Sequence, residues 1–181
     1  MIKIIQYNLL ALVAVFVARY LIVPMDHFNS DIGNYLWLPM GAVILAYLLF
    51  GFRVFPGLLV GYLLAEVVVE GGIANFAQHE VVSRVINTLL PLLSIWLMRK
   101  LNFSNFIVAN KLNYVQLVPL VVLSAFTTTI VKAGLLYAPD QFSAGKVYFQ
   151  SYVQGDILGG LIFIAVVFTI FSPALIRNKI I

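Results

Sequence analysis

The sequence contains no cysteine and few charged residues. Of its 181 residues, 62% are hydrophobic and 10% are charged, whereas an average soluble domain is roughly 25% charged. The missing cysteine excludes disulfides, a thiol nucleophile and a cysteine-based metal site. The shortage of charge excludes an ordinary soluble domain, and the mean hydropathy of +1.03 predicts an integral membrane protein.

Histidine is also scarce, since only His27 and His79 occur, both in predicted loops. Two isolated imidazoles do not give the ligand spacing of a metal site, so we expect no metal and no cofactor. Basic residues outnumber acidic ones and give a net charge of +4. They stand singly at the ends of apolar segments rather than in a patch, so nucleic acid is not an expected partner.

Six apolar segments are candidates to cross a bilayer, for which about 20 residues are needed. We predict an all-α polytopic membrane protein, with residues 1–181 forming a single domain built as a bundle of six transmembrane helices. The predicted spans are residues 5–23, 34–50, 54–71, 82–98, 113–137 and 154–176. Only Gly51, Phe52 and Arg53 separate the second span from the third. We therefore expect these two helices to form an adjacent antiparallel hairpin at the centre of the bundle.

The orientation follows from the positive-inside rule, by which cytoplasmic loops carry an excess of Lys and Arg. A cytosolic N-terminus places most basic residues, and no acidic ones, in the inner loops and tails. These inner basic residues are Lys3, Arg53, Arg99, Lys100, Lys111, Arg177 and Lys179. The acidic residues then fall in outer loops or near outer helix ends. We expect both termini in the cytosol.

Ionisable residues inside the spans all fall in the outer part of the predicted membrane region. They are Arg19, Glu66, Glu70, Arg84, Lys132 and Asp156. An isolated charge at mid-bilayer costs about 2.5–3.5 kcal/mol, so such residues usually pair or line a polar cavity. For the deeper Glu66, Lys132 and Asp156 we expect an interior polar network around an outward-opening cavity, with purely structural salt bridges as the alternative. For Arg19, Glu70 and Arg84, close to the boundary, we expect interfacial anchoring.

Uncharged polar residues extend this pattern. Asn87 stands about one turn beyond Arg84, and Ser124, Thr128 and Lys132 form an i, i+4, i+8 stripe that we expect to face the bundle interior. The candidates for a ligand site or polar network are Glu66, Glu70, Arg84, Asn87, Thr128, Lys132 and Asp156. No nucleophile, metal set or phosphate loop accompanies the carboxylates, so we do not expect an enzyme and assign no catalytic residue.

Short motifs rich in glycine and proline recur along the chain. They include Trp37, Pro39 and Gly41 in LWLPMGA, Arg53 after Gly51, then Pro56, Gly57 and Gly61 in FPGLLVG, and later Gly155, Asp156 and Gly159 in GDILGG. The glycines lie four residues apart within two spans, a spacing that allows helix backbones to approach closely. We assign these motif residues to packing.

These motifs resemble the MASE1 domain, a bacterial membrane sensory module usually found at the N-terminus of histidine kinases and diguanylate cyclases. The chain departs from the family's pattern at Leu38 and Met40, where a second proline is common. Family members usually have more spans and a cytosolic output domain. We therefore expect a short, standalone version in the bacterial cytoplasmic (inner) membrane.

The resemblance implies a sensory or binding module whose outward-facing polar cavity engages a small-molecule ligand or partner protein and passes the signal to another membrane protein. That membrane partner is expected to be a kinase, a cyclase or a transporter subunit. Two alternatives are the substrate-binding subunit of an energy-coupling-factor-type transporter and a structural subunit of an envelope complex. The ligand, the partner, the oligomeric state and the order of the helices stay open.

Overall fold

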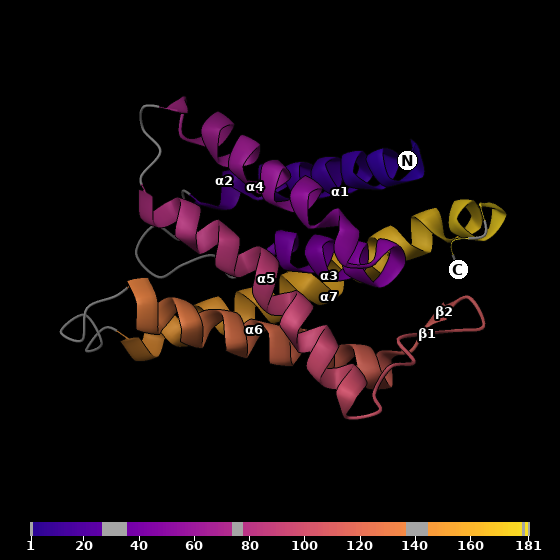
Figure 1. The fold of residues 1–181 in the computed structure, drawn as a ribbon. Helices are drawn as coiled ribbons and strands as arrows, with labels where there is room; N and C mark the ends of the chain where they lie inside the picture. Colours follow the sequence, from indigo (N-terminus) through magenta and orange to yellow (C-terminus); the bar gives the residue numbers. More distant parts are fainter. Residues whose placement is uncertain (1, 27–35, 74–77, 137–144, 179, 181) are drawn as a thin grey trace.

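The computed structural model describes residues 2–26, 36–73, 78–136, 145–178 and 180. Within these ranges the chain is helical apart from short connections and one small hairpin (Figure 1). The α-helices are α1 (Ile2–Leu21), α2 (Val23–Asp26), α3 (Leu38–Phe50), α4 (Phe55–Val69), α5 (Gln78–Lys100), α6 (Tyr114–Leu136) and α7 (Gly145–Arg177). A 3-10 helix η1 (Phe52–Val54) precedes α4, and the antiparallel strands β1 (Ile107–Val108) and β2 (Lys111–Leu112) connect α5 to α6.

The prediction of an all-α membrane protein is confirmed. Each predicted span has a helix as its counterpart, and five of these helices are long and apolar enough to cross a membrane. The α3 helix has 13 residues and extends roughly 20 Å, less than the hydrocarbon thickness of about 30 Å. It begins at Leu38 rather than at residue 34, and the predicted span residues Asn34, Tyr35 and Tyr137 lie outside the described ranges. The α7 helix begins at Gly145 rather than at residue 154.

The short α3 helix lies inside the bundle. It packs against α1, α5, α6 and α7, and Figure 1 shows it between α1 and α7. Every residue from Pro39 to Tyr47 is buried, as expected for a helix that is apolar on all faces. The hydroxyl of Tyr47 donates a hydrogen bond of 3.0 Å to the carbonyl of Thr88 on α5. The other helices therefore shield α3 from lipid.

The predicted adjacency of the second and third spans is wrong. The helices α3 and α4 share few contacts, and α1 packs against both of them. Gly51 has a φ of +75°, a left-handed conformation that suits glycine, and η1 adds a further turn before α4 begins. The short connection reverses the chain but also turns α4 away from α3.

Two glycines on α4 allow this helix to pack closely against α1. A Cβ added to Gly57 would collide with the backbone of Asn8, and one added to Gly61 would collide with the backbone of Leu12, both on α1. The side chain of Asn8 accepts a hydrogen bond from the Gly57 N–H at 2.8 Å and donates one to the carbonyl of Arg53 at 3.0 Å. Close backbone approach and this polar bridge join α4 to α1.

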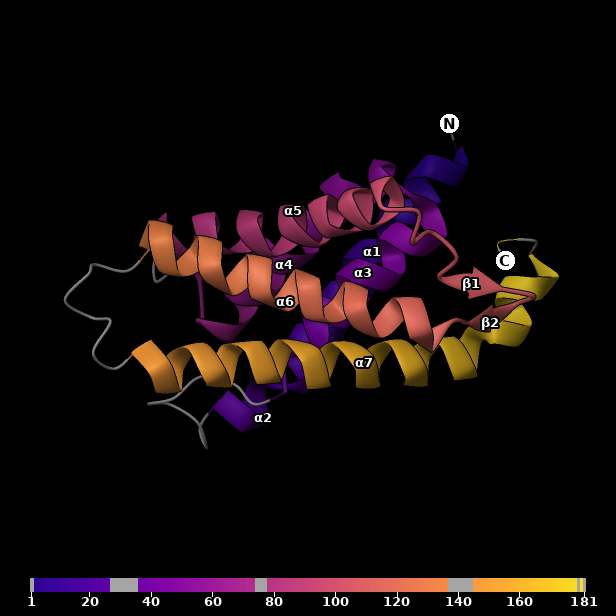
Figure 2. The same cartoon turned by 90° about the horizontal axis from the view of Figure 1, so that it is seen from below.

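The outward faces of the helices carry large apolar side chains. On α1 these include Ile5, Leu9, Leu10, Val13 and Val17, and on α7 they include Ile162, Val166, Ile170 and Phe171. Such a surface is suited to lipid. Both termini and the β1–β2 hairpin lie at one end of the bundle (Figure 2).

Candidate functional site

Buried polar side chains gather in the half of the bundle away from the termini. They come from five helices: Arg19 on α1, Glu66 on α4, Asn87 on α5, Ser124, Thr128 and Lys132 on α6, and Asp156 on α7. Arg84, on α5, is half-buried beside them. Helices that are distant in the sequence therefore bring their polar positions to one level of the bundle.

One carboxylate ties three helices together. The Oε1 atom of Glu66 accepts a hydrogen bond from Nε of Arg19 at 2.9 Å and lies 2.8 Å from Nη2 of Arg84. Glu66 is only 1% exposed, so its charge depends on these two guanidinium groups for compensation. We call Arg19, Glu66 and Arg84 the Glu66 triad. The predicted interfacial anchoring of Arg19 and Arg84 is wrong, because the buried carboxylate draws both arginines into the protein.

Trp37 connects this triad to α7. The guanidinium carbon of Arg19 and that of Arg84 each lie 5.4 Å from the centroid of the Trp37 ring, within cation–π range. The backbone N–H of Trp37 donates a hydrogen bond of 2.9 Å to the backbone carbonyl of Gly155. A Cβ added to Gly159 would collide with the Trp37 backbone. The glycine face of α7 thus fixes the segment that carries the indole.

A second group of polar residues lies between α5, α6 and α7. We call it the Lys132 cluster, and its members are Asn87, Ser124, Thr128, Lys132 and Asp156, all buried. The ammonium of Lys132 lies 5.8 Å from the centroid of the Tyr152 ring. Lys132 interacts electrostatically with Asp156, and also with Arg84 and Glu66. In the described part of the chain no ion pair within 4.0 Å joins Lys132 to Asp156.

Several polar atoms in and beside this cluster lack hydrogen-bond partners among the residues that the structure describes. They are Oδ1 and Nδ2 of Asn87, Oγ of Ser124, Oγ1 of Thr128, Oγ1 of Thr129, Nε of Arg84 and the hydroxyl of Tyr62. Leaving one such buried group unsatisfied costs about 1–3 kcal/mol. Their concentration here gives the cluster a large capacity for further hydrogen bonds.

The remaining predicted residues lie elsewhere. Glu70 caps the C-terminal end of α4 and is exposed, so the structure does not bring it into the cluster. Arg53 in η1 and Pro56 in the first turn of α4 are exposed, at the opposite end of the bundle. Pro39 is buried in the first turn of α3, and a Cβ on the next motif residue, Gly41, would collide with the backbone of α7.

Two further residues were missed by the sequence analysis. Tyr62 is fully buried on α4, and electrostatic interactions connect its hydroxyl with Arg84, Asp156 and Glu66. It lies one helical turn before Glu66, so the i, i+4 rule that was applied to Glu66 and Glu70 could have found it. Asn8, which bridges α1 and α4, is one of the few polar residues in the predicted span 5–23, together with Gln6 and Arg19.

The chemical groups in the site suit binding. Within the described ranges, no group of three His, Cys, Asp or Glu residues lies together in a way that could hold a metal ion. The site instead offers two carboxylates, three cations and a row of hydroxyl and amide groups. Hydrogen bonding and charge pairing with a polar molecule are the interactions that such groups support.

Comparison with protein families gives one match. The family model of MASE1 matches residues 7–177. Comparisons with curated proteins and with solved structures give no match. The matched range contains the Glu66 triad, Trp37 and the whole Lys132 cluster.

Proposed function

Since the chain belongs to the MASE1 family of membrane-associated sensory domains, we propose that a polar ligand or a partner protein engages its Lys132 cluster. The cluster is then the input site of the sensor. The resulting helix movement passes to another membrane protein, for which a kinase, a cyclase or a transporter subunit has the required role.

The observation that carries this proposal is the group of buried polar atoms without partners around Lys132. Asn87, Ser124 and Thr128 present hydrogen-bonding atoms that no described residue satisfies. The nearby Lys132 and Asp156, one basic and one acidic residue, do not form a direct ion pair with each other. A bound polar group that contacts these atoms recovers interaction energy that the protein alone leaves unused.

The α7 helix supplies the route for the signal. Asp156 belongs to the Lys132 cluster, while its neighbours Gly155 and Gly159 hold the backbone of Trp37. From there α7 continues to Arg177, at the end of the bundle that carries the termini. A shift of α7 therefore moves Trp37 against the two arginines of the triad and also moves the far end of the helix. Binding drives this shift only if the ligand prefers one helix arrangement over the other.

Location and chemistry form part of the same proposal. The end that carries both termini faces the cytosol of a bacterium, so the Lys132 cluster is reached from the outer side of the inner membrane. We assign binding rather than catalysis to the protein, and among the described residues no group of three His, Cys, Asp or Glu residues beside its carboxylates could hold a metal ion.

Spin labels provide a direct test of transmission along α7. The chain has no native cysteine, so Ile5→Cys on α1 and Ile170→Cys on α7 introduce two unique and exposed label sites. Distances between the labels are measured by pulsed electron paramagnetic resonance on the full chain in lipid nanodiscs. We expect Lys132→Met and Asp156→Asn each to shift or broaden the distance distribution, because each changes the charge balance beside α7.

Glu70→Gln is the matched control, since this carboxylate is exposed and lies outside the cluster. It should leave the distribution unchanged. Identical distributions in the wild type and in both cluster variants would contradict a coupling between the Lys132 cluster and the far end of α7.

A further inference from the structure

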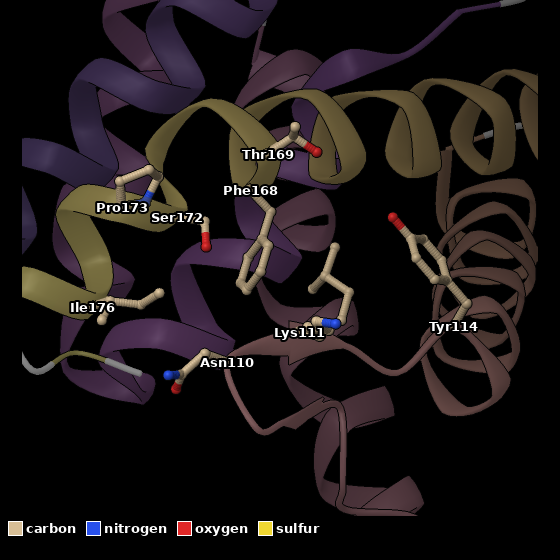
Figure 3. Close-up of a pocket in the computed structure, with 9 residues that line it drawn as sticks. Asn110, Lys111, Tyr114, Phe168, Thr169, Ser172, Pro173 and Ile176 are labelled. Atoms are coloured by element: carbon tan, nitrogen blue, oxygen red, sulfur yellow. The ribbon is translucent and has the colours of Figure 1, made fainter.

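A groove of about 610 Å³ lies at the end of the bundle that carries the termini. One wall is formed by the β1–β2 hairpin and the start of α6, and the other wall is the last part of α7 (Figure 3). The groove lies far along α7 from the Lys132 cluster and shares no residue with it. The groove is therefore a site separate from the Lys132 cluster.

The groove has two chemically different parts. Phe168 and Ile176 give it apolar surface, and the neighbouring Ile170 and Phe171 on α7 are exposed. Lys111, Tyr114 and Ser172 provide polar groups, and Figure 3 shows the hydroxyls of Tyr114 and Ser172 pointing into the space between the walls. A molecule that fills the groove thus needs both an anionic polar part and an apolar part.

Pro173 adds an acceptor to the polar part. Proline has no backbone N–H, so it cannot form the helical hydrogen bond to the carbonyl of Thr169, four residues earlier. Both residues line the groove. The Thr169 carbonyl can therefore accept a hydrogen bond from a hydroxyl group of a ligand.

The tight hairpin places Lys111 next to α7. Val108 pairs with Lys111, so only Ala109 and Asn110 form the turn, and both have positive φ, of 48° and 61°. Two successive positive φ angles are typical of the two-residue turns that match the twist of paired strands. The turn thereby fixes the backbone position of Lys111, which carries the positive charge of the groove.

The depth of the groove points to lipid. The apolar part of α7, Ser151–Arg177, has 27 residues and is roughly 40 Å long, which exceeds the hydrocarbon thickness of about 30 Å. The last turns of α7 therefore reach the headgroup layer while Phe168 stays near the acyl chains. A basic pocket at this level, beside apolar helix faces, suits the headgroup of an anionic lipid.

We infer that this groove binds an anionic phospholipid. Lys111 pairs with the phosphate diester, and the hydroxyls of Tyr114 and Ser172 donate hydrogen bonds to phosphate oxygens. The Thr169 carbonyl accepts a hydrogen bond from a headgroup hydroxyl such as that of phosphatidylglycerol. An acyl chain lies along Ile176 and the exposed face of α7. This inference does not depend on the function proposed for the Lys132 cluster.

The test is native mass spectrometry of the full chain released from nanodiscs that contain phosphatidylglycerol and phosphatidylcholine in equal amounts. We expect the wild type to retain phosphatidylglycerol in preference to phosphatidylcholine. Lys111→Gln should lower this preference about fivefold, the effect of removing one lysine near a charged membrane surface. Lys3→Gln, at the exposed start of α1, is the matched control and should leave the preference unchanged.

A second arm separates lipid from soluble phosphate. Millimolar inorganic phosphate or glycerol 3-phosphate should not displace the retained lipid, because neither has an acyl chain to occupy the apolar part of the groove. Displacement by either compound would overturn the assignment to lipid. An equal preference in the wild type and in Lys111→Gln would overturn the site itself.

Discussion

The Glu66 triad and the Lys132 cluster lie at the same level of the bundle, yet their polar groups are satisfied very differently. In the triad, the Glu66 carboxylate accepts a hydrogen bond from Arg19 and forms an ion pair with Arg84, and both guanidinium groups also contact the Trp37 ring. In the cluster, Lys132 and Asp156 make no direct pair, and hydroxyl and amide groups around them lack described partners. The triad is built to hold one arrangement of helices. The cluster retains polar groups that a ligand can engage.

This difference separates a structural role from a responsive one. Breaking a buried ion pair by removing one partner is strongly destabilising, because it leaves the other charge uncompensated. Removing a polar group that has no partner has no such consequence and can even stabilise the protein. Substitutions in the two groups should therefore affect stability in opposite ways.

The largest expected effect is that of Glu66→Gln. This change leaves the buried Arg19 and the half-buried Arg84 facing a neutral amide, and we expect it to lower the free energy of unfolding by about 3–5 kcal/mol. The measurement is unfolding in mixed micelles, followed by circular dichroism. Glu70→Gln, one turn further along the same helix and exposed, should change stability by no more than about 1 kcal/mol, the most that an exposed ion pair usually contributes. Similar losses of unfolding free energy in both variants would contradict the structural role assigned to the Glu66 triad.

An intermediate effect is expected for Gly159→Ala, which tests the link between the triad and α7. The new methyl group would collide with the backbone of Trp37, and overpacking of this kind typically costs about 1–3 kcal/mol. Gly134→Ala is the matched control, because a Cβ there meets no atom within 4 Å. Since alanine favours helix more than glycine does, the control should be neutral or slightly stabilised. The same unfolding assay reports both, and a stable Gly159→Ala variant would contradict the tight contact with Trp37.

The smallest effect should distinguish two adjacent threonines on α6. The Thr127 hydroxyl donates to the carbonyl of Leu123 at 2.8 Å and lies 3.2 Å from the hydroxyl of Ser94, whereas that of Thr128 has no described partner. Thr127→Val should therefore cost about 1 kcal/mol, while Thr128→Val should be neutral or stabilising. Equal losses in the unfolding assay would show that the Thr128 hydroxyl is already satisfied, and would weaken the case for the Lys132 cluster as an input site.

The sequence was sufficient to predict the helices and the burial of Glu66, Lys132 and Asp156. Long apolar segments and the insertion cost of Glu66, Lys132 and Asp156 are local properties, so they can be evaluated one segment at a time. The i, i+4, i+8 stripe of Ser124, Thr128 and Lys132 likewise specifies one face of α6, and the structure buries all three residues.

The partners of these residues could not be predicted in the same way. Gly57 and Gly61 indicate that some helix approaches α4 closely, but nothing in their spacing names α1. Arg19 and Arg84 look like interfacial residues until the fold brings Glu66 between them. Pairings between different helices depend on the order of the helices around α3, and the spacing of apolar residues does not encode that order.

The enclosed position of α3 has a consequence for how the protein is made. The backbone N–H of Trp37, just before α3, donates a hydrogen bond to the carbonyl of Gly155 on α7, a helix that is synthesised after α3, α4, α5 and α6. Until α7 enters the bilayer, that amide has no such partner in the apolar environment, and the short α3 has only part of its protein surroundings. The surroundings of α3 are therefore completed only after the ribosome has passed the codons for α7.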